Sequence, residues 1–245
     1  MIQIDGVNIL TDPTYNRSVG FIAPRMQKPG IPIDDLPPIH LILISHNDYD
    51  HLSIRTLRKL RRRHQCPVIV PVGDGKFARK AGFEEVAEMG WWESKDVTGI
   101  TVHAVPAKHK SNRAPFQRNK QLCSGYVVER NGVGVYFAGD TGFGPHFEQI
   151  ASRFKNLRLA LLPIGAFQPE WFMAPHHMSP PDALKAHFIL RTHISVAMHY
   201  GTFRLGDDQQ NEPVENLQSN IAATDMHGTQ FWIMDFGESR AVPPL

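Results

Sequence analysis

The chain has 245 residues, of which 42% are hydrophobic, and its 26 lysine and arginine residues nearly balance 24 aspartate and glutamate residues, for a net charge of +2. This composition supplies an ordinary core, so we expect one domain over residues 1–245. The nearly balanced charge argues against a dedicated nucleic-acid binder. The two cysteines, Cys66 and Cys123, are far apart and indicate neither a disulfide scaffold nor a thiol metal site. No stretch approaches the ~20 apolar residues of a membrane span, and the first residues show no signal-peptide pattern, so we expect a cytoplasmic protein that at most contacts a membrane peripherally.

The first third of the chain predicts a hairpin, a long loop and a strand followed by a helix. An Asp-Gly dipeptide between the apolar runs Ile2–Ile4 and Val7–Thr11 is typical of a hairpin turn. Five prolines within residues 15–38 indicate a loop rather than a regular element. Residues 40–44 are a short apolar run, typical of a strand that is buried on both faces, and a helix is expected from Leu52 to about residue 64.

Strands and helices then alternate to the end of the chain, which predicts an α/β protein. The expected strands are residues 67–71, 100–106, 123–129, 133–138, 159–164, 194–198 and 231–234. The expected helices are residues 76–81, 145–153, 183–190 and 213–223. Residues 167–177 are rich in aromatic residues and histidine, and we expect no helix there because prolines interrupt the segment.

Four potential metal ligands, His46, Asp48, Asp50 and His51, directly follow the predicted strand at residues 40–44. Residues two apart in an extended loop point to the same side, so His46 and Asp48 can bind one ion, while Asp50 and His51 can face a second ion. Two adjacent divalent ions are typical of hydrolases. The alternative is a polar surface turn with helix-capping aspartates, but capping explains neither histidine.

Three further potential ligands also follow predicted strands. His109 comes just after residues 100–106, Asp140 lies in a Gly-Asp-Thr-Gly sequence after residues 133–138, and His199 comes directly after residues 194–198. Taken alone, His109 is better explained as a surface histidine between two lysines. The strand ends of an α/β sheet are nevertheless where such folds carry their chemistry, so we expect these residues to meet.

Together these residues resemble the metallo-β-lactamase superfamily, and within it the N-acyl-phosphatidylethanolamine-hydrolysing phospholipase D family and its bacterial relatives. The segments that carry the resemblance are residues 9–13 (Ile-Leu-Thr-Asp-Pro), 45–52 (Ser-His-Asn-Asp-Tyr-Asp-His-Leu), 139–142, 162–167, 171–173 and 199–203, with His177. The resemblance implies an αβ/βα four-layer sandwich.

The resemblance also implies a site with two metal ions. The implied ligands of the first ion are His46, Asp48, His109 and Asp140, and those of the second are Asp50, His51, His199 and Asp140, which bridges both. Asp12 is expected to hydrogen-bond the ligand-carrying loop, and His176 and His177 to lie near the substrate. Zinc is the default metal. The family has a histidine where this chain has Asp48, and a harder oxygen ligand shifts the preference towards manganese or iron.

The implied reaction is hydrolysis by a hydroxide that bridges the two ions. Asp140 and Asp50 hold the reacting centre, and His177 steadies the substrate or protonates the leaving group if it titrates near neutrality. A phospholipid diester of the N-acyl-phosphatidylethanolamine kind is the first expectation for the substrate. The alternative substrates are a small soluble phosphodiester, a cyclic sugar phosphate or a lactone. Two alternative functions are a nuclease, for which the sequence lacks a basic channel, and a non-catalytic metal sensor on the same fold.

A run of basic residues behind the first motif has two interpretations. It comprises Arg55, Arg58, Lys59, Arg61, Arg62 and Arg63. Such a run is more often the solvated face of a helix, but it can also attract phosphate on an anionic membrane surface. If the lipid interpretation is right, neutralising Arg61, Arg62 and Arg63 should abolish sedimentation with vesicles. The aromatic residues in 167–178 and the loop at 21–33 could then line a lipid-accepting groove, although aromatic stripes more often belong to a core.

Overall fold

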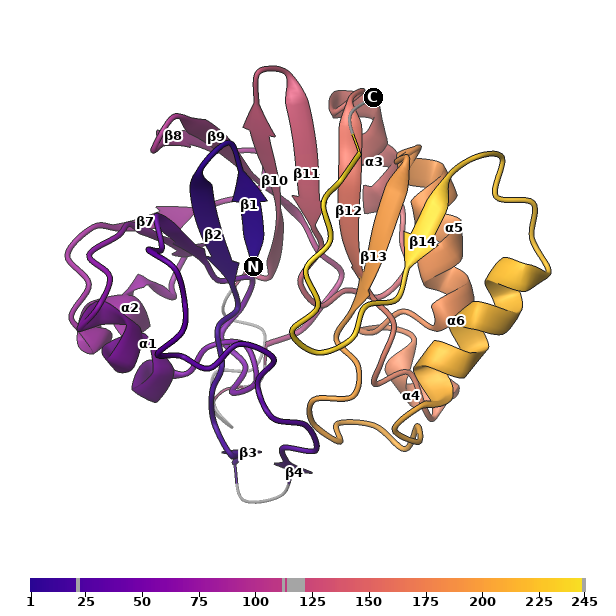
Figure 1. Ribbon diagram of the computed structural model, residues 1–245, viewed down its shortest axis with the longest axis horizontal. Helices are drawn as coiled ribbons and strands as arrows, with labels where there is room; N and C mark the ends of the chain where they lie inside the picture. Colours follow the sequence, from indigo (N-terminus) through magenta and orange to yellow (C-terminus); the bar gives the residue numbers. More distant parts are fainter. Residues whose placement is uncertain (21–22, 112, 114–121, 244–245) are drawn as a thin grey trace.

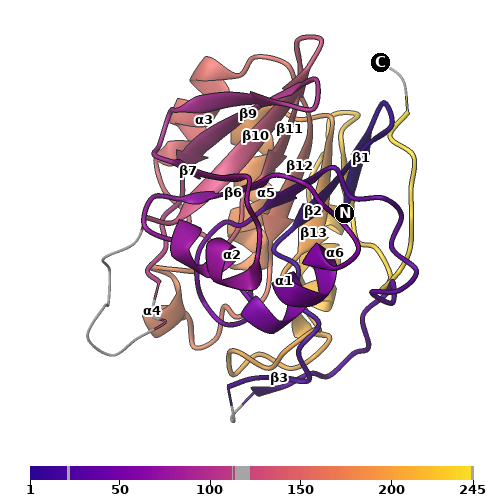
Figure 2. The ribbon, with the colours of Figure 1, turned by 90° about the vertical axis from the view of Figure 1, so that its left-hand side faces the viewer.

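The structure is a computed structural model of the chain, and it describes residues 1–20, 23–111, 113 and 122–243. Two β-sheets pack face to face, and helices cover the outer face of each sheet (Figures 1 and 2). The order of layers is therefore helix, sheet, sheet, helix. This confirms the predicted αβ/βα four-layer sandwich.

The first sheet has the strand order β1-β2-β5-β6-β7. Its strands are β1 (Ile2–Ile4), β2 (Val7–Thr11), β5 (Leu41–Leu43), β6 (Val68–Pro71) and β7 (Val86–Met89), and its helices are α1 (Ile54–Arg61) and α2 (Gly75–Ala81). Strands β2, β5, β6 and β7 run parallel, so their carboxyl ends share one edge of the sheet. The side chains of β5 are fully buried because Leu41 and Leu43 face the second sheet while Ile42 packs towards α1 and α2.

The second sheet has the strand order β14-β13-β12-β11-β10-β9-β8. Its strands are β8 (Ser94–Val97), β9 (Ile100–Pro106), β10 (Ser124–Arg130), β11 (Val133–Phe137), β12 (Leu157–Pro163), β13 (Ile194–Met198) and β14 (Gln230–Trp232). Strand β10 is antiparallel to both β9 and β11, whereas β11, β12 and β13 are mutually parallel. The carboxyl ends of β9, β11 and β13 therefore lie at the same edge.

Three apolar clusters hold the layers together. One lies between the two sheets, one between the first sheet and its helices, and one between the second sheet and α3 (His146–Arg153), α5 (Pro180–Leu190) and α6 (Glu212–Ala222). Burial of apolar surface in these clusters is the main force that fixes the layers. The loops at the shared strand edge are free of this requirement, so they can carry polar side chains.

Several elements were not predicted. The proline-rich segment contains the short hairpin of β3 (Ser18–Val19) and β4 (Ala23–Pro24), and β7 and β8 form where no strand was expected. The expectation that prolines prevent a helix within residues 167–177 was wrong, because α4 (Glu170–Met173) forms one turn immediately after Pro169. Proline stands before this turn, where it removes no helical hydrogen bond. Among the described residues, no helix is both long and apolar enough to traverse a bilayer.

Candidate metal centre

The loop between β5 and α1 brings the first four potential ligands to the shared strand edge. β5 ends at Leu43, and α1 begins at Ile54 after Ser53, whose side chain caps the helix by accepting a hydrogen bond from Thr56 N at 3.1 Å. The loop is anchored at both ends by regular structure, so residues 46–51 turn back over the edge of the sheet. His46 and His51 are buried there, with 1% and 6% of their surface exposed.

The other three potential ligands arrive from the second sheet. His109, Asp140 and His199 follow β9, β11 and β13, as predicted, and meet the loop of the first sheet. We call these seven residues the His/Asp cluster: His46, Asp48, Asp50, His51, His109, Asp140 and His199. The cluster contains two sets, and the ligand atoms of each set lie within 4.8 Å of one another. One set is His46, Asp48 and His109, and the other is Asp50, His51, Asp140 and His199.

The distances in each set are those of side chains that converge on a common point. Asp48 Oδ2 is 3.6 Å from His46 Nε2 and 3.5 Å from His109 Nε2. Asp140 Oδ2 is 3.2 Å from both His51 Nε2 and His199 Nε2. Asp140 also forms a third group with His109 and His177, so its carboxylate stands between the two sets. His177 therefore joins the cluster more closely than the sequence indicated, since its Nδ1 is 3.8 Å from Asp140 Oδ2.

Several of the converging atoms have no hydrogen-bond partner among the described residues. The Nε2 atoms of His46, His51, His109 and His199 and the Oδ1 atom of Asp140 are all buried in this state. Leaving a buried polar atom without a partner costs about 1–3 kcal/mol, and several such atoms at one point are rare in a folded protein. Imidazole nitrogen and carboxylate oxygen are preferred ligands of zinc and similar cations, so these residues fit a metal site.

Asp12 orients one histidine of the cluster and the chain before it. Asp12 directly follows β2, its Oδ2 accepts hydrogen bonds from His51 Nδ1 at 2.7 Å and Ser45 Oγ at 2.5 Å, and its Oδ1 accepts one from Ser45 N at 2.7 Å. Because the Nδ1 of His51 donates to a carboxylate, the lone pair of the neutral ring is on Nε2, which faces the cluster. The sequence-based expectation for Asp12 agrees with these contacts.

A second group of residues, which the sequence did not reveal, supports the other end of the loop. Asn47 Nδ2 donates to the buried Asp74 Oδ1 at 2.6 Å, and Ser111 Oγ hydrogen-bonds both Asn47 Oδ1 and Asp48 Oδ1, the latter at 3.1 Å. Arg113 Nη1 donates to the carbonyl oxygen of Asn47 at 2.6 Å. The only sequence signal for Asp74 was its place after the predicted strand at residues 67–71, the same position that the ligands occupy after theirs.

Backbone carbonyl groups and glycine complete the support. His109 Nδ1 donates to the carbonyl oxygen of His176 at 3.0 Å, which leaves its Nε2 for the cluster. Gly139 has φ of +61°, and a Cβ atom there would lie 2.5 Å from Ser45 Cβ. Only glycine allows the chain after β11 to approach the chain after β5 this closely, and this approach brings Asp140 beside the first loop.

The charges of the cluster shift its pKa values in opposite directions. Burial alone would lower the pKa of His51, but the carboxylates of Asp140, Asp50 and Asp12 together raise it well above its ordinary value. Burial alone would raise the pKa of Asp140, but His199 and His51 hold it well below its usual range. Burial lowers the pKa of His177 to about 3, against the attraction of Asp140. The premise that His177 titrates near neutrality was therefore wrong, and its ring is neutral at pH 7.

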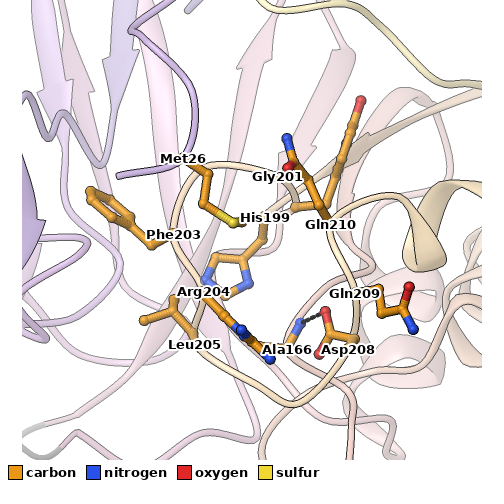
Figure 3. A pocket seen from close by; sticks show the side chains of 11 residues that line it. Met26, Ala166, His199, Gly201, Phe203, Arg204, Leu205, Asp208, Gln209 and Gln210 are labelled. Atoms are coloured by element: carbon orange, nitrogen blue, oxygen red, sulfur yellow. Dashed lines mark hydrogen bonds between the residues drawn. The ribbon is translucent and has the colours of Figure 1, made fainter. Parts of the chain in front are cut away.

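Two cavities border His199. A cavity of about 230 Å³ is lined by the cluster residues Asp50, His51, Asp140 and His199 and by apolar side chains that include Phe137, Met198, Phe203 and Leu205. A smaller one of about 20 Å³ lies between His199, Met26 and Arg204 (Figure 3). Beside it, Asp208 accepts a hydrogen bond from Ala166 N at 3.2 Å, which fixes the turn after β12 (Figure 3). Nothing in the sequence indicated this role for Asp208.

Comparison with known proteins identifies the family. A family model described as "Beta-lactamase superfamily domain" matches residues 7–200. The chain belongs to the metallo-β-lactamase superfamily. This confirms the resemblance in the sequence, and it is consistent with the fold and with the His/Asp cluster at the strand edge.

Individual relatives add detail. The chain is 31% identical to "N-acyl-phosphatidylethanolamine-hydrolyzing phospholipase D 1" of Caenorhabditis elegans, over 97% of this chain and 72% of that protein. It is 33% identical to the mitochondrial protein of the same activity name from Saccharomyces cerevisiae, over 87% of this chain but only 48% of that protein. Among solved structures, the metallo hydrolase Igni18 from Ignicoccus hospitalis shares the fold, with a TM-score of 0.71 at 23% identity over 96% of this chain and 91% of that one. The protein is thus a member of a superfamily of metal-dependent hydrolases, and it spans about half of the yeast relative.

Proposed function

We propose that the protein is a metal-dependent phosphodiesterase that hydrolyses a phospholipid of the N-acyl-phosphatidylethanolamine kind by phospholipase D-type cleavage. The observation that carries this proposal is the similarity to two proteins named for that activity, over 97% and 87% of the chain, together with the His/Asp cluster in place. The family match over residues 7–200 includes both the first ligand-carrying loop and His199, so the whole cluster lies within it.

The proposed ligands fall into the two sets of the cluster. His46, Asp48 and His109 would hold one divalent ion, and Asp50, His51 and His199 a second, with Asp140 shared between them. Zinc is the default, and Asp48 makes manganese or iron suitable alternatives. When bound, such a pair of ions lowers the pKa of water and polarises a phosphoryl oxygen.

The protein's own residues hold this site in a reactive arrangement. Asp12 and the carbonyl oxygen of His176 fix the ring orientations of His51 and His109 through their Nδ1 atoms. His177 presents a neutral ring beside Asp140, so it would hydrogen-bond the substrate rather than supply a proton as a cation. The leaving oxygen of a phospholipid headgroup would then take its proton from water, which reaches the cluster from the open side of the cavity at His199.

Exposed aromatic side chains support a lipid substrate. Trp171 and Phe172 of α4 are 83% and 60% exposed, and α4 precedes His176 and His177 by a few residues. Large exposed aromatic residues beside a site indicate contact with an apolar partner. Other aromatic-segment residues, Phe167 and Met178, belong to the core, so only part of the segment is available for this contact. Of the other loop considered, Phe21 lies outside the described residues.

The size of the cavity favours a second candidate, a small soluble phosphodiester, cyclic sugar phosphate or lactone. The cavity of about 230 Å³ beside the cluster combines apolar side chains, such as Phe137, Phe203 and Leu205, with the polar residues of the cluster. An apolar cavity of about 150 Å³ holds one benzene molecule, so this cavity accepts a group somewhat larger than a single ring rather than a full acyl chain. In the lipid proposal, the remaining length of an acyl chain would lie outside the cavity, along the exposed aromatic residues.

The test combines metal analysis with two substrates. Elemental mass spectrometry on the purified protein should find about two ions per chain, and Asp140→Ala should lose them while Asp207→Ala, a carboxylate outside the cluster, keeps them. N-acyl-phosphatidylethanolamine in mixed micelles should yield N-acylethanolamine and phosphatidate. Cleavage of a soluble diester alone would favour the second candidate. Absence of bound metal that zinc, manganese or iron cannot restore would refute both candidates. Bound metal without cleavage of either substrate would favour the sensor.

A further inference from the structure

A hollow lined by basic side chains lies outside the His/Asp cluster. It has a volume of about 300 Å³ and lies between the loop after β2 and the outer side of α1. We call it the basic hollow: its lining includes Arg17 from the loop and Arg55 and Lys59 from α1, with neutral polar residues that include Asn16, Ser18 and Thr56, and no acidic residue is among the described residues that line it. Ser18 of β3 and three residues of α1 contribute to this lining.

The three cations of the basic hollow have no acidic partner in the part of the chain that the structure describes. Arg61 and Arg63 of the same basic run do have partners: Arg61 Nη2 is 3.2 Å from Glu84 Oε1, and Arg63 Nη1 is 2.5 Å from Asp34 Oδ1. Among the described residues, no such ion pair involves the cations of the hollow. Two residues of the basic run, Arg61 and Arg63, thus balance acidic neighbours, and two others, Arg55 and Lys59, line the hollow without an acidic partner among the described residues.

Three exposed positive charges gather at this hollow, and together they attract an anion. Arg55 and Lys59 are four residues apart on α1, so they lie on the same face, and like charges at this spacing destabilise a helix. The fold adds a third positive charge, Arg17, from a distant part of the sequence. Guanidinium groups present several N–H donors in a plane that matches the oxygen atoms of phosphate, and lysine adds a mobile point charge.

Hydrogen bonds make the wall of the hollow a built structure. Tyr15 N donates to Thr56 Oγ1 at 3.0 Å, and Ser53 Oγ donates to Asn16 Oδ1 at 2.9 Å. Ser53 stands two residues after His51, so the same segment that carries the ligand loop also forms the hollow. The loop that bears Arg17 is thereby fixed against α1, so the fold sets the positions from which Arg17, Arg55 and Lys59 line the hollow.

We propose that the basic hollow is a binding site for a phosphate-bearing anion, separate from the His/Asp cluster. The anion is either a free phosphate monoester or the phosphate of a lipid headgroup, since both offer the same chemistry to Arg17, Arg55 and Lys59. A lipid headgroup there would hold the strand edge with the His/Asp cluster against a membrane surface, while a soluble phosphate would report on a metabolite. The site requires neither bound metal nor hydrolytic activity.

The experiment compares two double variants that remove equal charge from the basic run. Arg55→Gln/Lys59→Gln alters the basic hollow, and Arg58→Gln/Arg62→Gln alters exposed basic residues that do not line it. One arm measures binding of sn-glycerol 3-phosphate by calorimetry, and the other measures sedimentation with vesicles of phosphatidylcholine alone or with phosphatidylglycerol. Metal content and melting temperature are recorded for every protein, so that binding at the cluster and loss of folding are recognised.

We expect the hollow variant to bind at least tenfold more weakly than the wild type in one of the two arms, and the control variant to bind within about twofold. The binding should weaken as salt rises, because exposed charges are screened. Loss in the calorimetric arm identifies a soluble phosphate, and loss only with phosphatidylglycerol vesicles identifies a headgroup. Equal losses in both variants, or no binding to either probe, would overturn the proposal without affecting the proposed hydrolase.

Discussion

Replacement of Asp12 by asparagine should weaken metal binding without disturbing the backbone. Asp12 has φ of +41°, a left-handed conformation that asparagine adopts as readily as aspartate, so the substitution adds little strain. The amide keeps one oxygen that can accept from Ser45 N, but an amide nitrogen at the other position would donate to His51 Nδ1 instead of accepting from it. His51 would then carry its proton on Nε2, the atom that faces the cluster.

The size of the effect follows from the hydrogen bonds that the substitution removes. Two of the three hydrogen bonds to the Asp12 carboxylate, those from Ser45 Oγ and His51 Nδ1, would no longer form. Loss of a carboxylate that orients a ligating histidine typically weakens metal affinity about 10–100-fold, which corresponds to roughly 1.4–2.7 kcal/mol. Most of this loss should fall on the ion that His51 is proposed to bind, so one of the two ions should be affected more than the other.

The assay is competition with a chromogenic zinc chelator, which resolves the two dissociation constants. The matched control is Asp34→Asn, because Asp34 is an exposed carboxylate whose partner is the surface residue Arg63. We expect one dissociation constant of Asp12→Asn to rise at least tenfold and the control to match the wild type. If both constants of Asp12→Asn stay within twofold while the protein remains folded, the reasoning about the His51 tautomer is wrong.

Three further substitutions test other parts of the argument. Gly139→Ala places a Cβ atom against Ser45, so urea unfolding should show a loss of about 2–4 kcal/mol in the free energy of unfolding. The control Gly228→Ala has a similar positive φ but open space around it, and should lose about 1 kcal/mol. Equal losses in the two variants would contradict the close-approach argument. Burial lowers the pKa of His187 to about 4, below the value of about 6.5 in an unfolded chain, so protonation in acid favours unfolding. Between pH 7 and pH 5 the free energy of unfolding should fall by about 2 kcal/mol more in the wild type than in His187→Gln. Parallel curves of stability against pH for the two proteins would refute this. Asp48→His replaces an oxygen ligand with a nitrogen ligand, so the ratio of zinc to manganese affinity should rise. It also removes one negative charge, so the KM for an anionic diester should fall. An unchanged affinity ratio would show that Asp48 is not a ligand.

The sequence indicated the potential ligands because each follows a run with a clear strand pattern. His46 to His51, His109, Asp140 and His199 all stand just past apolar segments, and parallel strands necessarily bring such positions to one edge. Strand β8 escaped prediction because three of its four residues are exposed and carry no alternation of apolar and polar side chains. β3 and β4, of two residues each, are too short to produce a pattern.

Interactions between distant segments could not be predicted in the same way. The link from Asp74 through Asn47 and Ser111 to Asp48 joins three stretches of chain, and nothing local distinguishes these residues from ordinary turn residues. The titration of His177 likewise depends on burial by surrounding elements rather than on its sequence neighbours. Division of the basic run into paired and unpaired residues depends on where Glu84, Asp34 and Arg17 are brought by the fold.

The first sheet explains why the ligand loop is held from both sides. The loop follows β5, whose neighbours in the sheet are β2 and β6, and all three strands run parallel. Each neighbour delivers an aspartate just beyond its carboxyl end: Asp12 after β2 holds Ser45 and His51, and Asp74 after β6 holds Asn47. The pairing of the strands thus fixes the loop laterally, while the second sheet supplies the facing side chains. A shift in the register of β2 or β6 would move these aspartates by a whole residue, about 3.3 Å, so the geometry of the site depends directly on that pairing.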